Sequence, residues 1–443
     1  MVVILKLKLM KLKLKFLLCI FYSILWFIFS LYFALMWVGT ISNYMSTFLA
    51  WLLVTGMALI PGLAMAFINV SLLMDKRPIY NTNIQFPPIS ILIAAYNEED
   101  TIEKTLISIL EQDYNNQIEV IIANDGSIDS TLAKAKEFIL NNHRPNITMK
   151  IVDSPMNVGK SNVLNLGLLE VNNEYVLTID ADSELYKDAL KHIVSCLMES
   201  GDDYAAVAGS IVCKNFNNTF ITKLQDWDYI LGISAVKRIQ SMYKGTLVAQ
   251  GAFSIYKKSV LNEVGGWPDK IGEDIVLSWA ILNQGYHINH SENAICFTNV
   301  PETYKIFYRQ RKRWARGLIE AFISYPKMLF KKKMYVFFIW YNLMFPYIDL
   351  MFIFGFVPGV LLALFFGFYL LAGKITLLLL PLTFLYSSII YTIQKKKFIE
   401  LNLDWGSKNY SYIMYMFFYQ ILMTPATLFG YLSEIFKRKR VWK

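Results

Sequence analysis

Long apolar runs stand at both ends of the 443-residue chain, and its middle is spared. The first two runs cover about residues 16–38 and 48–74, and each exceeds the ~20 residues that cross ~30 Å of hydrocarbon. The pattern predicts a transmembrane helical hairpin within residues 1–80. A cleaved signal peptide is disfavoured for the first run, because its apolar core is too long and no small-x-small site follows.

Between these ends, residues 85–325 alternate two kinds of pattern. PPISILIAAY is typical of a strand buried on both faces, and DTIEKTLISILEQ has a helical period, with Asp100 as predicted N-cap and Glu103 at the capping-box position. Strands are predicted at IEVIIAND, MKIVDS and EYVLTIDAD, and helices at SIDSTLAKAKEFILNN and SNVLNLGLLEV. This alternation predicts right-handed βαβ units and an α/β, Rossmann-like domain with a mostly parallel sheet. The polar clusters YNEE, NDGS and DADS end the strands, where such sheets bind ligands.

The C-terminal apolar region, residues 334–436, is predicted to hold three to four helices. Its first stretch, 334–372, would make a helix of about 58 Å, too long for one crossing. It therefore forms either two passes or one pass plus an in-plane helix, with Pro346 and Pro358 as breaks. Further spans are predicted at about 374–393 and 410–436. We favour three spans plus an interface helix near 334–345.

The charge distribution orients these helices. The formal net charge is +9, and basic runs at 6–15, 331–333, 395–397 and 437–440 each adjoin a hydrophobic stretch. Lys and Arg in such places mark the cytoplasmic side and meet anionic headgroups, so nucleic acid is not expected as a partner. A multi-pass plasma-membrane protein with a cytoplasmic N-terminus and a cytoplasmic 85–325 domain follows. Beyond residue 334 the rule conflicts with itself, because one span separates two basic runs.

Cysteine and histidine predict no chemistry. The four cysteines lack a CxxC pair, which favours buried reduced thiols over disulfides or zinc. His287 and His290 lie in the predicted strand GYHINHSENA and are expected to be structural.

Acidic residues at two predicted strand ends are the first candidates for a site. Asp180 and Asp182 form an Asp-x-Asp whose side chains point to one side, which suits a hard divalent cation bound to a diphosphate. Asp125 precedes Gly126, and its carboxylate could close a turn or bind a base or ribose.

Other candidates have equally plain structural alternatives. Tyr96 and Glu98 could stack on a base and bind its edge, and Lys160 opens a helix where phosphate would lie or is a solvated lysine. Glu273 and Asp274 start an apolar helix, where acids are favourable for dipole reasons alone. In QRKRW, Arg313 stands beside Trp314 on a basic helical segment, which an amphipathic interface helix would also produce.

Together AAYNEE, NDGS, NVGKSNVLN, DAD, GED and QRKRW, in this order, resemble the processive inverting family 2 glycosyltransferases. These are the cellulose, chitin and hyaluronan synthases and, nearest, the bacterial poly-β-1,6-N-acetylglucosamine synthases. The resemblance covers about residues 87–317. It implies a nucleotide-diphospho-sugar transferase domain and a membrane-embedded enzyme that transfers sugar, N-acetylglucosamine in our leading hypothesis, from a UDP-sugar to a growing exopolysaccharide and translocates it.

The resemblance also implies a role for each motif residue. Contacts to the uridine would come from Tyr96, Glu98 and Asp125, and Lys160 would lie beside the uridine. Asp180 would face the donor. Asp182 would coordinate Mg²⁺ or Mn²⁺. The general base would be Asp274, next to Glu273. The diphosphate and acceptor sugar would be held by Gln310, Arg313 and Trp314, and the acceptor would be lined by Gln250 and Gly251. One departure stands out, since Gly272 replaces the threonine usual before Glu-Asp.

One base acting on an α-linked donor predicts in-line displacement and a β-linked product, with metal and arginine stabilising the diphosphate. The implied partners are the UDP-sugar donor, the polysaccharide acceptor and membrane lipids, with room for a small membrane accessory subunit. Donor sugar and linkage stay open, so chitin, hyaluronan or β-glucan synthesis are alternatives. Single-sugar transfer to a lipid is disfavoured by QRKRW and the many passes. A transporter or scaffold with a degenerate enzyme domain is disfavoured because the motif residues are all present: Asp125, Asp180, Asp182, Asp274, Arg313 and Trp314.

Overall fold

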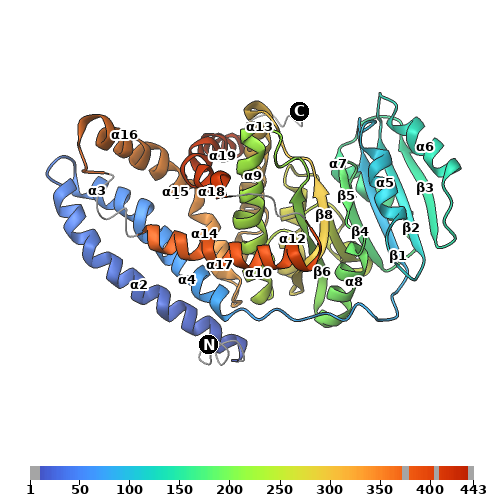
Figure 1. Cartoon of the computed structure of the whole chain (residues 1–443), viewed down its shortest axis with the longest axis horizontal. Helices are drawn as coiled ribbons and strands as arrows, with labels where there is room; N and C mark the ends of the chain where they lie inside the picture. Colours follow the sequence, from blue (N-terminus) through green and yellow to red (C-terminus); the bar gives the residue numbers. More distant parts are fainter. Residues whose placement is uncertain (1–9, 372–378, 404–408, 438–443) are drawn as a thin grey trace.

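The computed structural model describes residues 10–371, 379–403 and 409–437. Within these residues an eight-stranded sheet has the order β3-β2-β1-β4-β7-β6-β8-β5 (Figure 1). The strands are β1 Ile89–Ala95, β2 Ile118–Asp125, β3 Ile147–Ser154, β4 Tyr175–Asp180, β5 Ser183–Leu185, β6 Tyr204–Cys213, β7 Phe253–Lys257 and β8 His287–Thr298.

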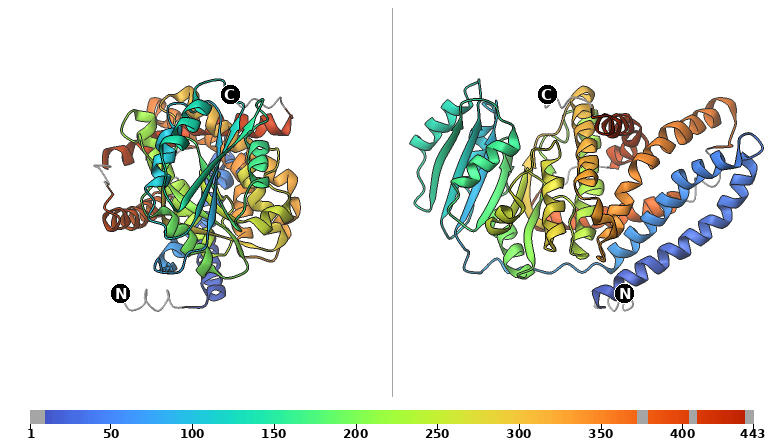
Figure 2. Two further views of the ribbon diagram at one scale, coloured as in Figure 1. Left: turned by 90° about the vertical axis from the view of Figure 1, so that its right-hand side faces the viewer. Right: turned by 180° about the vertical axis from the view of Figure 1, so that it is seen from behind.

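The sheet is mixed, so the prediction of a mostly parallel sheet is wrong for its second half. The pairs β1–β2, β2–β3, β1–β4 and β6–β8 are parallel, whereas β7 runs antiparallel to both β4 and β6 and β5 runs antiparallel to β8. The strand–helix alternation that predicts parallel crossovers ends at β4. Beyond it the strands curl away with the sheet's twist (Figure 2).

Helices cover both faces of the sheet because strand side chains alternate between them. Ile91 packs in one apolar cluster with Leu106, whereas its neighbour Leu92 packs in another with Leu164 and Trp279. The first face is covered by α5 Ile102–Leu110, α6 Thr131–Asn141 and α8 Ala189–Ser200. The second is covered by α7 Lys160–Leu169, α10 Ala235–Met242 and α12 Glu273–Gln284. Shorter connections are α9 Phe220–Asp228, the π-helix η2 Tyr229–Ser234 and α11 Lys258–Val264.

The first helix of the domain begins one residue later than predicted. Thr101 is the N-cap of α5 and no side chain caps it, so the prediction of Asp100 as N-cap is wrong. The turn is held from the other side, since the backbone N–H of Ile102 donates to the Glu98 carbonyl at 3.0 Å. The Thr101 hydroxyl donates to the Glu98 carboxylate at 2.8 Å and accepts no hydrogen bond from the helix backbone.

The predicted thiols and histidines are as expected. All four cysteines are free and buried, and His287 and His290 lie in β8, 8% and 2% exposed. Both histidines are part of the sheet's packing.

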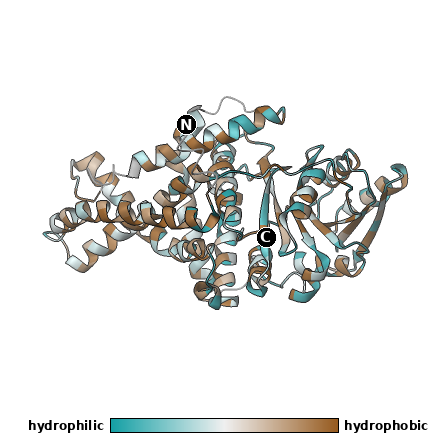
Figure 3. Ribbon diagram, turned by 90° about the horizontal axis from the view of Figure 1, so that it is seen from below, coloured by the Kyte–Doolittle hydropathy of each residue, from teal (hydrophilic) through white to brown (hydrophobic). Residues whose placement is uncertain are grey.

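Four helices in the described part of the chain are long and apolar enough to cross a membrane: Leu12–Ile41, Thr47–Met74, Val336–Phe366 and Tyr410–Ile435. Their segments are α2 Leu12–Ile41, α3 Thr47–Val54, η1 Thr55–Leu59, α4 Ile60–Met74, α14 Val336–Leu343, α15 Phe345–Met351, η4 Phe352–Phe356, α16 Val357–Phe366, α18 Asn409–Met414, η6 Tyr415–Tyr419 and α19 Gln420–Ile435. The first two form a hairpin that projects from the α/β domain (Figure 1), and apolar residues dominate this end of the molecule (Figure 3).

The long C-terminal stretch forms one candidate span with breaks. Pro346 stands at the start of α15 and Pro358 at the start of α16, where the helical geometry changes, as predicted. The segment predicted as an interface helix near 334–345 contains α14, which is the first part of the candidate span Val336–Phe366, so an interface position stays a prediction. Of the span predicted at 374–393, residues 374–378 lie outside the described residues; the rest belongs to α17 Leu379–Glu400, which is not among the four candidates.

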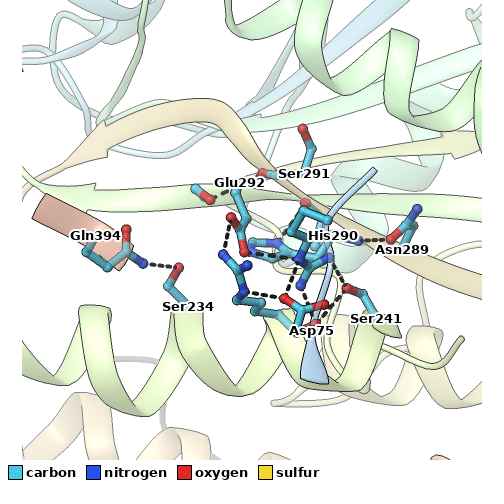
Figure 4. A network of polar contacts seen from close by, with 12 residues as sticks. Asp75, Ser234, Ser241, Asn289, His290, Ser291, Glu292 and Gln394 are labelled. Carbon is cyan, nitrogen blue, oxygen red and sulfur yellow. Dashed lines mark hydrogen bonds and ion pairs between the residues drawn. The ribbon is translucent and has the colours of Figure 1, made fainter. Parts of the chain in front are cut away.

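A buried polar network fastens the chain where it leaves the hairpin (Figure 4). Asp75, directly after α4, accepts a hydrogen bond from Arg238 of α10, and Arg238 also pairs with Glu292 of β8 at 2.7 Å. Arg77 reaches the same Glu292 at 3.3 Å and donates to Ser241 at 2.7 Å. We call these residues the Glu292 network. It ties the hairpin to the sheet by charge as well as by apolar packing.

A second junction joins the α/β domain to the last candidate span. Helix α13 (Tyr304–Ser324), followed by the 3₁₀ turn η3 Pro326–Phe330, packs along α19. A Cβ added at Gly430 of α19 would lie 2.6 Å from both the Ala315 Cβ and the Lys312 carbonyl oxygen of α13. Arg316 donates to Glu434 at 2.9 Å. The two helices are therefore in backbone contact, with an ion pair beside it.

Candidate active site

The predicted polar clusters meet at one edge of the sheet. Strands β1, β2 and β4 are parallel neighbours, with Ala94 opposite Asp180 and Ala95 opposite Asn124. Asp125 and Asp180 end their strands, and Tyr96 follows β1 directly. The carboxyl ends of parallel strands share an edge, so these side chains come from adjacent positions.

Asp125 holds the loop before α7. Its carboxylate accepts the backbone N–H of Val158 at 2.7 Å and of Gly159 at 3.1 Å, and the residue is 4% exposed. Burial raises the Asp125 pKa, and these two hydrogen bonds lower it. Gly126, with φ of 64°, allows the close approach, since a Cβ there would lie 2.5 Å from the Met156 carbonyl carbon. The turn-forming alternative is thus realised, and contact with uridine stays a prediction.

The end of β1 is cross-linked to the same region. Asn97, in the left-handed region with φ of 57°, receives the Ile128 N–H on its side-chain oxygen at 3.0 Å and donates its own N–H to Ser127 at 3.1 Å. Burial, aided by Asp182 and Asp180 and opposed by the Thr101 hydrogen bond, raises the pKa of Glu98 to about 7. Glu98 therefore stands within the electrostatic reach of the Asp-x-Asp pair, while Tyr96 beside it is half-buried.

A lysine between two carboxylates forms the centre of the site. The Lys160 ammonium pairs with Asp180 and lies 3.6 Å from Glu273 Oε1. Although burial alone would lower the Lys160 pKa, the two carboxylates raise it, so the lysine is charged. A Cβ at Gly251 would lie 2.9 Å from Lys160 Nζ and 3.5 Å from Glu273 Oε1. Residues predicted from four separate motifs are thereby in contact.

The Asp-x-Asp carboxylates fit a divalent cation by their chemistry. Burial and the neighbouring Asp180 raise the pKa of Asp182 to about 6. Like charges held together in this way are relieved by a hard cation that takes carboxylate oxygens. No group of three or more acidic, histidine or cysteine side chains close enough to hold a metal is found among the described residues. Among the described residues, fewer than three such ligands therefore come together at this point.

The two acids at the start of α12 lie in different surroundings. Glu273 is 7% exposed, and burial, more than the opposing Lys160, raises its pKa to about 7. Asp274 is half-buried, and its Oδ1 accepts the N–H of Ile275 at 2.8 Å. Lys237 of α10 is near enough to feel the Asp274 charge, although burial lowers the lysine's pKa to about 7. Glu273 lies within ion-pair distance of Lys160. The second carboxylate oxygen of Asp274 accepts no hydrogen bond from a described residue.

Two amides present unused acceptors. The side-chain oxygens of Gln250 and Gln310 are buried and accept no hydrogen bond within the described part of the chain. Gln250 is oriented by its own amide, which donates to the Gly209 carbonyl at 2.7 Å. A buried amide oxygen costs free energy unless a donor reaches it, so both are suited to bind the hydroxyl or N–H groups of a ligand.

Helix α13 contributes the basic and aromatic residues. Arg313 is exposed, and its charge influences both Lys160 and Glu273. Trp314 is 39% exposed, and its ring lies 6.4 Å from that of Tyr229. Tyr229 in turn is within reach of the Asp182 charge. The acceptor candidates therefore border the carboxylate cluster, as the motif order predicts.

Some residues of this region were not predicted. Arg311 is buried between Asp228 and Trp314, and Gly317 and Glu320 contact Gly272. Arg311 had a signal, because it lies four residues after Phe307 and three before Trp314, on the apolar face of its helix. For the glycine and the glutamate the contacts span more than forty positions, and no local pattern indicates them.

Comparisons with known proteins agree with this fold and these motifs. Residues 90–265 match the family model described as Glycosyl transferase family 2. The chain is 37% identical over 234 residues to the poly-β-1,6-N-acetyl-D-glucosamine synthase of Staphylococcus epidermidis, covering 53% of this chain and 55% of that protein. It is 35% identical over 262 residues to the synthase of the same description from Staphylococcus aureus strain MSSA476, covering 57% and 61%. The chain thus spans somewhat more than half the length of these relatives.

A solved structure extends the likeness in fold. The mannosyltransferase PcManGT from Pyrobaculum calidifontis, in complex with GDP-Man and Mn²⁺, has a TM-score of 0.61 and 18% identity, with 87% of this chain and 98% of that chain covered. This likeness shows a GT-A, Rossmann-like nucleotide-sugar transferase fold with a mixed, curled sheet. The predicted resemblance to the poly-N-acetylglucosamine synthases is confirmed over the matched residues. Residues 90–265 are therefore similar in sequence to a Glycosyl transferase family 2 domain and lie within a nucleotide-sugar transferase fold.

Proposed function

We propose that this chain is a membrane-embedded, inverting and processive β-glycosyltransferase that transfers N-acetylglucosamine from UDP-N-acetylglucosamine to a growing exopolysaccharide. The observation that carries the proposal is the Asp180–Lys160–Glu273 chain of charges beside Gly251. It brings the donor, metal, base and acceptor motifs together at one sheet edge. The identity to synthases of this polymer supports the choice of sugar.

On the donor side, the nucleotide would lie across the ends of β1 and β2, with Tyr96, Glu98 and Asp125 around the uridine. Lys160 and Arg313 supply positive charge for the diphosphate. Asp182, with Asp180, would hold Mg²⁺ or Mn²⁺. When bound, this cation would neutralise charge on the departing diphosphate. The two basic side chains would do the same from the protein, and Lys160 needs little reorganisation because it is already fixed between two carboxylates.

On the acceptor side, Asp274 would take the proton from the acceptor sugar's hydroxyl. The hydroxyl oxygen would then form a bond to the anomeric carbon of the donor while the bond from that carbon to UDP breaks. Its second carboxylate oxygen accepts no hydrogen bond from described residues, so it is free for this step. Glu273 holds Lys160 in place. Gln250, Gly251, Gln310 and Trp314 would line the acceptor, with the indole stacking on the apolar face of a pyranose.

The membrane arrangement belongs to the same proposal. Residues 1–80 would form a hairpin in the plasma membrane, 85–325 the cytoplasmic catalytic domain, and 334–436 a region of three to four helices. The contact between α13 and α19 packs the helix that carries Trp314 directly against the last candidate span, which supports an acceptor site next to the membrane region. Its partners would be the UDP-sugar, the polysaccharide, lipids and a small accessory subunit.

Incubation of the purified protein in nanodiscs with a panel of UDP-sugars and Mn²⁺ tests the proposal. Polymer should form from UDP-N-acetylglucosamine and be degraded by a hydrolase specific for β-1,6-linked N-acetylglucosamine, with none formed by Asp274→Asn. Polymer from a different UDP-sugar, or a product degraded only by chitinase, would overturn the choice of sugar or linkage. Single-sugar addition to lipid would overturn processivity.

A further inference from the structure

Arg311 is a buried arginine that none of the proposed roles uses. It lies on α13 and is 2% exposed, yet it stands between Gln310 and the exposed Arg313. Its guanidinium pairs with Asp228, the last residue of α9, at 3.1 Å. Burying a charge is unfavourable unless a partner compensates for it. The guanidinium carries a full positive charge in a buried position and is paired with a carboxylate from another helix. Such a costly arrangement suggests that Arg311 has a function.

The guanidinium lies against aromatic rings. Its central carbon is 4.1 Å from the centre of the Trp314 ring, 5.1 Å from that of Phe307 and 5.9 Å from that of Tyr419. A cation within about 6 Å of an aromatic face is attracted by it, most strongly at tryptophan. The stack on Trp314 is the closest of the three, so one side of the indole is occupied by protein.

Directional hydrogen bonds contribute little to this arrangement. The Nε and one terminal nitrogen of Arg311 donate no hydrogen bond to any described residue. Arg311 is therefore held by charge and by stacking. The stacking depends on the flat guanidinium, which a lysine ammonium cannot reproduce, whereas a lysine would keep the positive charge.

The cluster joins three parts of the molecule. Asp228 comes from α9, Arg311 and Trp314 from α13, and Tyr419 from the π-helix η6 that precedes α19. Trp314 also adjoins Tyr229, the residue after Asp228, and keeps 39% of its surface exposed. The indole of Trp314 is thus held by residues of the α/β domain and of the last candidate span, and part of it stays exposed.

We propose that Arg311, paired with Asp228, is a positioning residue that fixes the ring plane of Trp314 for stacking on the acceptor sugar. The proposal rests on the function proposed above, because Trp314 is the acceptor residue there. Arg311 touches no substrate. It acts through the indole, and it should affect elongation rather than donor binding.

Arg311→Lys is the central variant, with Arg309→Lys, exposed on the same helix, as its matched control. Elongation of a β-1,6-linked N-acetylglucosamine oligosaccharide should fall about tenfold in Arg311→Lys, while UDP affinity stays within about twofold of wild type. Arg309→Lys should match wild type in both. A parallel loss of UDP affinity, or elongation within about twofold of wild type, would contradict the proposal.

A double-mutant cycle separates positioning from general damage to the fold. In a Trp314→Ala background, Arg311→Lys should add less than about a twofold further loss, because the ring it positions is absent. A full, multiplicative loss would assign Arg311 a structural role elsewhere. If Arg311→Lys is not recovered folded, Asp228→Asn takes its place, since it removes the charge partner and leaves the guanidinium. The same non-additivity with Trp314→Ala is expected.

A spectroscopic readout distinguishes failure of this inference from failure of the proposed function. In protein labelled with 5-fluorotryptophan, the Trp314 resonance is assigned with Trp314→Phe. It should shift and broaden in Arg311→Lys and stay unchanged in Arg309→Lys. An unchanged resonance in Arg311→Lys refutes the positioning role whatever the enzyme makes. A wild-type protein that forms no polymer, with the resonance shifted as expected, refutes only the proposed reaction.

Discussion

Gly272 and Gly317 are in direct backbone contact. A Cβ added at Gly317 would lie 2.7 Å from the Gly272 Cα, and one added at Gly272 would meet Gly317 as closely. Gly272 is the N-cap of α12, and its N–H donates to the Glu320 carboxylate of α13 at 2.9 Å. This contact fixes the distance between the helix that begins with Glu273 and the helix that carries Trp314. It also gives a steric reason for glycine at position 272, where a side chain would collide with Gly317.

Gly272→Ala should impair the site by separating these helices. The added methyl has no room, so about 1–3 kcal/mol of stability should be lost, and polymer synthesis should fall with it. Gly39→Ala, where nothing lies within 4 Å of the added carbon, is the matched control and should behave as wild type. Thermal unfolding and initial rates of UDP release measure both effects. Equal behaviour of the two variants would mean that the helices adjust freely.

Asp182→Ala should abolish synthesis and weaken UDP binding in the presence of Mn²⁺ while the protein stays folded. The reason is that Asp182 and Asp180 are the carboxylates that fit a divalent cation. Asp202→Ala, an exposed aspartate of the same domain, serves as control. Titration of Mn²⁺ against UDP affinity measures the loss. Near-normal, chelator-insensitive synthesis by Asp182→Ala would make the pair turn residues only.

Asp274→Asn should bind the UDP-sugar almost normally and lose turnover by about a hundredfold or more, because general-base assistance is typically worth 10²–10⁴. Glu273→Gln should be milder if Glu273 mainly holds Lys160. UDP release and donor affinity are measured for both variants in nanodiscs. If Glu273→Gln is inactive and Asp274→Asn is active, the general base is Glu273. If both variants stay active, neither acid is the base, and the two acids are explained by their favourable interaction with the helix dipole at the start of α12.

Glu292→Gln should destabilise the junction between the hairpin and the sheet. Although burial alone would raise it, Arg77 and Arg238 lower the Glu292 pKa to about 2, below its ordinary 4.5. The stabilisation is therefore present above pH 4.5 and is lost as the pH falls toward 2. Near neutral pH the variant should lose about 3 kcal/mol, because two arginines are left with Asp75 alone.

Thermal unfolding of Glu292→Gln and wild type from pH 7 downward checks the sign. The difference in melting temperature should shrink below about pH 4.5, since the Glu292 carboxylate takes up its proton in the unfolded state there and in the folded state only near pH 2. Glu111→Gln, at an exposed position at the end of α5, should show no difference at either pH. A gap that widens on acidification would contradict the assignment of Glu292 as the charged partner.

Local pattern predicts the first half of the domain well. Strands β1 to β4, and the meeting of Asp125, Asp180 and Tyr96 at one edge, follow from apolar runs and from the crossover rule. The direction of β7 does not follow, because it is set by packing after the alternation has ended. The cap of α5 is likewise decided by Glu98, which engages Thr101 from the preceding loop.

The candidate site divides in the same way. The candidate catalytic and binding side chains lie in short motifs, and these motifs predict them. The residues that hold those side chains, such as Arg311, Gly317 and Glu292, act across long separations in the chain. Glu292 lies 217 positions after Asp75, and only folding reveals that the two share Arg238.

The packing of α13 against α19 limits how the chain can vary in length. Arg313 and Trp314 face the site, and Ala315 and Arg316, directly after them, contact α19. One residue inserted between these pairs would turn the rest of α13 by about 100° about its axis. Either Trp314 would turn away from the proposed acceptor position, or Ala315 would lose its contact with Gly430. Point substitutions can be absorbed by neighbours, but insertions and deletions within 313–316 cannot.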